Sequence, residues 1–72
     1  MLTYKFLHKA DGESVFAYFP NGHEDAPGKV AISDNRKGRV IEESKEDFGS
    51  RYAYHAIHGI NLEKEKGTVA WY

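Results

Sequence analysis

The sequence pattern that most resembles a metal-binding motif is a pair of histidines, His55 and His58. On a helix, a spacing of three residues places both imidazoles on one side, as metal ligands require. Arg51 would share that stripe and repel a cation, and the helix dipole alone favours positive charge near the C-terminal end. The sequence offers no defined third ligand. We therefore expect neither a metal site nor a bound cofactor.

A polar loop over residues 21–28 combines His23 with the carboxylates of Glu24 and Asp25. Loops held by a rigid scaffold often carry function. The same residue types suit a solvent-exposed connection equally well, and their spacing indicates no particular reaction. The sequence alone leaves open whether this loop or the histidine pair is functional.

A third candidate is one face of a predicted hairpin near the start of the chain. Asp11-Gly12 is typical of a two-residue type I′ turn, because both central residues need a positive φ. Such a turn places opposite each other residues whose numbers sum to 23, so that Phe6 lies opposite Ala17 and His8 opposite Val15. A slip of one residue would exchange the two faces of the hairpin.

This register directs Lys5, Phe16 and Tyr18 to the outer face of the hairpin. Aromatic rings flanked by lysines can stack the bases of single-stranded nucleic acid. An exposed apolar patch is also typical of a protein interface, including self-association. The net charge of −1 lacks the basic excess that phosphate contact needs, so protein contact is the preferred interpretation.

The elements that must position these residues follow from hydrophobic periodicity and turn signals. Strands are predicted over residues 2–9, 14–20, 29–33, 39–43 and 68–72, and a helix over residues 45–58. Ser44 to Asp47 fits a capping box at the helix start, and Gly59 fits its C-terminal cap. The predicted fold class is α+β. A single domain over residues 1–72 has one helix packed on one face of an antiparallel sheet of four to five strands, in the order β-β-β-β-α-β.

The predicted core combines one face of the sheet with the apolar side of the helix. A loop over residues 35–38, closed by a left-handed Gly38, would place Ile32 opposite Ile41. The predicted core residues are Tyr4, Phe6, Val15, Ala17, Phe19, Val30, Ile32, Ile41, Phe48, Tyr52, Ala56, Ile57, Ile60, Val69 and Trp71.

Composition disfavours several classes of function. The 72 residues contain no cysteine, which excludes disulfides and thiol nucleophiles, and the sequence has no glycine-rich phosphate loop or zinc-protease motif. No apolar run is long enough to span a membrane, and the N-terminus lacks the pattern of a signal peptide. These features favour the cytoplasm.

We therefore expect a small non-enzymatic accessory protein that acts through protein contact. The alternative is a single-stranded nucleic-acid-binding module that uses the aromatic and lysine face of the sheet. The expected binding residues are Lys5, Phe16 and Tyr18 on the hairpin, and Arg51, Tyr54, His55 and His58 on the helix.

Overall fold

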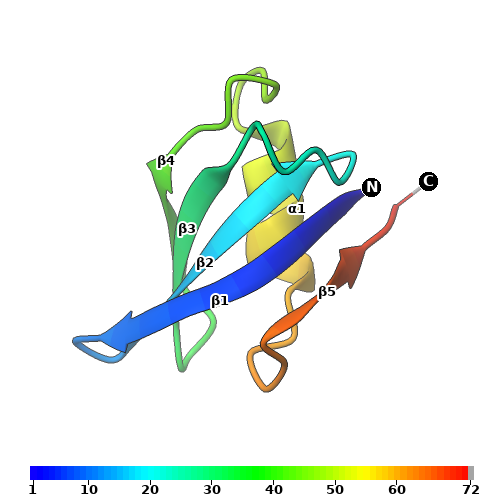
Figure 1. Cartoon of the computed structure of the whole chain (residues 1–72). Helices are drawn as coiled ribbons and strands as arrows, with labels where there is room; N and C mark the ends of the chain where they lie inside the picture. Colours follow the sequence, from blue (N-terminus) through cyan, green and yellow to red (C-terminus); the bar gives the residue numbers. More distant parts are fainter. Residues whose placement is uncertain (72) are drawn as a thin grey trace.

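The computed structural model describes residues 1–71 and confirms the predicted α+β architecture. The elements are β1 (Leu2–Ala10), β2 (Glu13–Pro20), β3 (Gly28–Ser33), β4 (Gly38–Glu42), α1 (Arg51–Gly59) and β5 (Lys66–Val69). The strands form one antiparallel sheet in the order β4-β3-β2-β1-β5. In Figure 1, α1 lies behind the sheet, and within residues 1–71 no element covers the opposite face. Tyr72, predicted to end the last strand, lies outside the described residues.

The β1–β2 turn has the predicted type I′ geometry. Asp11 and Gly12 both adopt positive φ angles, of 53° and 77°. Close to the turn the predicted register is also correct, because His8 lies opposite Val15. The Asp-Gly pair thus determines the first part of the hairpin.

A β-bulge between Phe6 and His8 then shifts the register by one residue. Phe6 lies opposite Phe16 instead of Ala17, and the predicted register is wrong from this point on. Because side chains alternate between faces, the shift exchanges the two faces of β2. Phe16 and Tyr18, predicted to be on the outer face, are fully buried.

The β2 residues that the predicted register placed in the core, Val15, Ala17 and Phe19, are on the outer face of the sheet instead. Phe19 is partly exposed there. Val15 and Ala17 are buried, as predicted, but on the outer side of the central strand β2. Their small side chains are shielded by neighbouring strands rather than by the helix.

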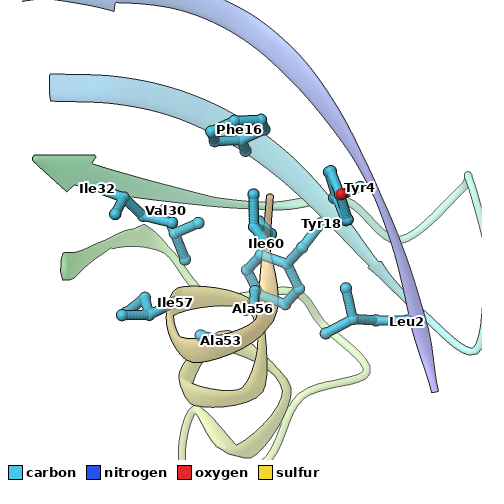
Figure 2. Close-up of a cluster of buried hydrophobic side chains, with 10 residues drawn as sticks. All are labelled: Leu2, Tyr4, Phe16, Tyr18, Val30, Ile32, Ala53, Ala56, Ile57 and Ile60. Atoms are coloured by element: carbon cyan, nitrogen blue, oxygen red, sulfur yellow. The ribbon is translucent and has the colours of Figure 1, made fainter. Parts of the chain in front are cut away.

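The core lies between the sheet and α1, as Figure 2 shows. Its buried members are Leu2, Tyr4, Phe16, Tyr18, Val30, Ile32, Ala53, Ala56, Ile57 and Ile60. Phe16 makes edge-to-face contacts with Tyr4 and Phe6, at ring-centroid distances of 5.7 and 5.5 Å. Partly buried residues packed against this core are Phe6, Val40, Tyr52, Leu62, Val69 and Trp71.

Two residues predicted to lie in the core are exposed. Ile41 is 45% exposed, because Ile32 pairs with Gly38 and not with Ile41. Arg36, at φ 69°, takes the left-handed position expected for Gly38. Gly38 is needed for a different reason, since a β-carbon there would collide with Ile57. The second exposed residue that was predicted to lie in the core is Phe48, at 82% exposure.

The helix begins at Arg51, six residues later than predicted. Its capping group is the carboxylate of Asp47, which accepts hydrogen bonds from the backbone N–H groups of Tyr52 (3.0 Å) and Ala53 (3.1 Å). The predicted capping box at Ser44 is therefore wrong, although its last residue supplies the cap. Gly59 is the final helical residue rather than a left-handed cap.

Tyr18 connects the central strand to this cap. Its hydroxyl donates a hydrogen bond to Asp47 Oδ2 at 2.7 Å and accepts one from the Ser44 backbone N–H at 3.1 Å. The Ser44 hydroxyl in turn donates to the carbonyl of Ala26 at 2.6 Å. Burial raises the pKa of Tyr18, and the Asp47 hydrogen bond and charge raise it further, whereas the Ser44 hydrogen bond opposes the shift.

Removing the Tyr18 hydroxyl should destabilise the domain. In Tyr18→Phe, the buried Ser44 N–H loses its partner and Asp47 loses one donor. We expect a loss of about 1–3 kcal/mol in the free energy of unfolding, measured by urea denaturation. Tyr54→Phe is the matched control, because Tyr54 is 60% exposed. A loss below about 0.5 kcal/mol in Tyr18→Phe would contradict this role.

The raised pKa of Tyr18 also predicts a loss of stability at alkaline pH. Its ordinary pKa is 10.0, and above that pH the unfolded state loses a proton that the folded state retains. The stabilisation is complete below about pH 10 and declines as the pH rises above it. Urea denaturation at several pH values should give a shallower alkaline decline for Tyr18→Phe than for the wild type. Equal slopes would exclude the shift.

Candidate functional site

One exposed and three half-buried aromatic side chains gather beside the first half of α1. Phe48, Arg51, Tyr52, His55 and Trp71 line a hollow of about 200 Å³. The first turns of the helix supply three of these residues, Phe48 precedes the helix, and Trp71 follows β5. We call these five residues the aromatic patch.

Trp71 is held in the patch by two rings of the helix. It stacks on His55 with a centroid distance of 3.8 Å and an interplanar angle of 5°. Tyr52 contacts it edge to face at 5.4 Å. Tyr52 and His55 are three residues apart, so both rings lie on the same side of α1. Trp71 therefore contacts the edge of the core and stays partly exposed.

Phe48 is directed outward by the backbone that follows it. Gly49 and Ser50 both have positive φ angles, of 68° and 59°, so the chain leaves Asp47 and turns before α1 begins. Phe48 is therefore not on the helix, and its predicted burial was based on a helical periodicity that does not extend to it. Gly49 was the available sequence signal, because glycine weakens a first helical turn and favours such a conformation.

The four predicted helix residues are found on the outer side of α1 as expected. Arg51 and His55 belong to the aromatic patch. Tyr54 and His58 are exposed but do not line its hollow. The helix thus brings together only part of the predicted set, and the patch gains Phe48, Tyr52 and Trp71, which the sequence had placed in the core.

The open face of the sheet carries a row of lysines across the strands. The register places Lys66 of β5 opposite Lys5 of β1, Lys5 opposite Ala17 of β2, and Ala17 opposite Lys29 of β3. All three lysines are exposed. Of the predicted hairpin residues, only Lys5 is on this surface.

A second hollow, of about 590 Å³, adjoins the lysine row. Thr68, Thr3 and Phe19 form the next row across β5, β1 and β2 and contribute to its lining, together with Lys5 and Lys66. We call the residues of these two rows the lysine face: Thr3, Lys5, Phe19, Lys29, Lys66 and Thr68. Glu24 lines the hollow from the loop after β2.

The basic side chains of the sheet differ in their partners. Arg39, on β4, forms two hydrogen bonds with the Glu13 carboxylate, whose hydrogen bonds and charge raise the pKa of Arg39. Lys5, Lys29 and Lys66 form no ion pair within residues 1–71. Their charges are therefore the ones available to an external anion.

The loop after β2 is attached to the segment before the helix. His23 Nδ1 lies 2.7 Å from Glu46 Oε1, and Ala26 accepts the Ser44 hydrogen bond through its carbonyl. In the part of the chain that the structure describes, no three histidine or acidic side chains converge to form a metal site. His23, Glu24 and Asp25 therefore do not complete a site with the two helix histidines. No helix within residues 1–71 is long and apolar enough to cross a bilayer.

Comparison with protein-family models, with curated proteins and with solved structures finds no match to this chain.

Metal addition should leave the stability of the domain unchanged. The helix histidines have different surroundings, since His55 stacks on Trp71 and His58 is exposed. We expect zinc, nickel or a chelator to leave the melting temperature as it is, because only a ligand that binds the native state raises it. Stabilisation by zinc that disappears in His55→Ala or His58→Ala would contradict this expectation.

Proposed function

We propose that this chain is a small non-enzymatic accessory protein that acts through protein contact, with the aromatic patch as its interface. The observation that carries the proposal is Phe48, which is 82% exposed and lines a hollow together with the rings of Tyr52, His55 and Trp71. Burying a phenylalanine side chain releases about 1.5–3 kcal/mol. A partner that covers this side chain would obtain that stabilisation.

The composition of the patch supports this function. Tryptophan, tyrosine and arginine are the residues that dominate binding energy at protein interfaces, and the patch has one of each. Trp71 and Tyr52 are already ordered by ring contacts, which lowers the entropy lost on binding. The left-handed conformation of Ser50 is unfavourable for a residue other than glycine, yet it helps to hold Phe48 outward.

Several features favour a binding protein over an enzyme. The sequence has no thiol nucleophile and no phosphate-binding glycine loop. The lack of cysteine fits the cytoplasm as the place where the protein acts.

The proposal can be tested by substituting Phe48. We expect Phe48→Ser to fold normally and to lose the proteins that the wild type captures from its native cell, identified by mass spectrometry. Ile41→Ser is the matched control, because Ile41 is 45% exposed on β4 and outside the patch. For a captured protein, purified binding should change the fluorescence of Trp71, the single tryptophan.

Two results would contradict the proposal. The first is recovery of the same proteins by Phe48→Ser and the wild type. The second is purified binding that weakens equally in Ile41→Ser and Phe48→Ser. If the chain captures a second copy of itself, sedimentation should show a dimer that Phe48→Ser dissociates.

A further inference from the structure

We infer that the lysine face is a second binding surface and that its ligand is a single-stranded nucleic acid. Its residues alternate along the strands with Tyr4 and Tyr18, which face the core, so they lie on the other side of the sheet. Figure 1 shows that α1 does not cover that side. This surface combines cations in a row, two threonine hydroxyls and one partly exposed aromatic ring. The inference is independent of the aromatic patch.

The charges of the lysine row can be neutralised by an anionic ligand. Lys5 and Lys66 are directly opposite each other on adjacent strands, an arrangement that destabilises a sheet when the charges are alike. Neither forms an ion pair within the described residues. Two carboxylates are near the surface, Glu42 opposite Lys29 and Glu24 at the hollow. The surface thus carries three lysines and two exposed acidic side chains, and its excess of positive charge lies at Lys5 and Lys66, on β1 and β5.

The geometry of the row fits a chain of phosphates better than one phosphate. Neighbouring strands are about 4.8 Å apart. The backbone positions of Lys66, Lys5 and Lys29 are therefore spread over about 14 Å across the sheet. Ala17 lies between Lys5 and Lys29, and its small side chain leaves a shallow depression in the surface there. A single phosphate would contact only the pair at Lys5.

Phe19 supplies the second feature of such a surface. It lies opposite Thr3 on the outer face, two positions along β2 from Ala17, and lines the hollow. Two residues along a strand correspond to about 7 Å. A base can stack on this ring while its phosphates contact the lysine row, and stacking requires an unpaired base. This favours a single strand over a duplex.

The aromatic residue of this surface is Phe19, whereas the sequence predicted Phe16 and Tyr18. Phe16 and Tyr18 are in the core and can contact no ligand. The bulge in β1 that buries them is the feature that turns Phe19 outward. The lysine positions Lys29 and Lys66 come from strands whose pairing the sequence did not determine.

The experiment is fluorescence anisotropy of a labelled oligothymidylate of about 12 nucleotides, at about 50 and about 200 mM salt. With three phosphate contacts, affinity should fall about 20-fold over this range. Lys5→Gln, Lys29→Gln and Lys66→Gln should each weaken binding and reduce the salt dependence. Lys45→Gln is the matched control, since Lys45 is exposed outside the lysine face and should have no effect.

Phe19 is tested by two variants. Phe19→Ala should weaken binding by about tenfold without changing the salt dependence, because stacking is not ionic. Phe19→Leu keeps the apolar volume if the alanine variant is unstable, and it should weaken binding similarly. Phe48→Ser should bind the oligonucleotide normally, which separates this surface from the aromatic patch.

Five results would overturn the inference. One is the absence of binding at about 50 mM salt. Another is an equal effect of Lys45→Gln and Lys5→Gln. A third is lysine dependence without any effect of either Phe19 variant, and a fourth is equal competition by polyglutamate, since both indicate a general polyanion surface. The last is competition by a mononucleotide at the same concentration as the oligonucleotide, which indicates a site for one nucleotide.

Discussion

The hydrogen bond from the Tyr18 hydroxyl to Asp47 joins the centre of the sheet to the start of the only helix in residues 1–71. The same carboxylate accepts the first free N–H groups of α1. A nine-residue helix is not stable alone in water, so its position depends on such tertiary contacts. Phe48 follows Asp47 directly, and the aromatic patch is therefore located by this one buried interaction.

The β-bulge in β1 is the condition for that hydrogen bond. Without the register shift, Tyr18 would face away from the helix and could not reach Asp47. Gly28 on the adjacent strand leaves room for the Tyr18 ring, since a β-carbon there would collide with it. Among residues 1–71, no buried side-chain nitrogen or oxygen lacks a hydrogen-bond partner. The hydrogen bonds of the Asp47 carboxylate and the Tyr18 hydroxyl offset the cost of removing these groups from water.

The same two features produce two surfaces of different chemistry on opposite sides of the domain. The bulge turns Phe19 toward the uncovered side of the sheet, where the lysine row crosses the strands. The Asp47 cap places Phe48 and α1 so that an aromatic surface forms around Trp71 on the helix side. The sheet separates the two surfaces, so both could be occupied together.

The sequence by itself determined what depends on neighbouring residues: the order of the strands and helix, the Asp11-Gly12 turn, and the outer position of Arg51, Tyr54, His55 and His58. These follow from periodicity and turn stereochemistry, which act over a few residues. Only the tertiary structure decided the spatial strand order, the bulge, the late helix start and hence the faces of Phe16, Tyr18 and Phe48. A bulge changes the pairing by one residue without a local signature, and the buried hydrogen bond of Tyr18 to Asp47, 29 residues away in the sequence, favours the shifted register.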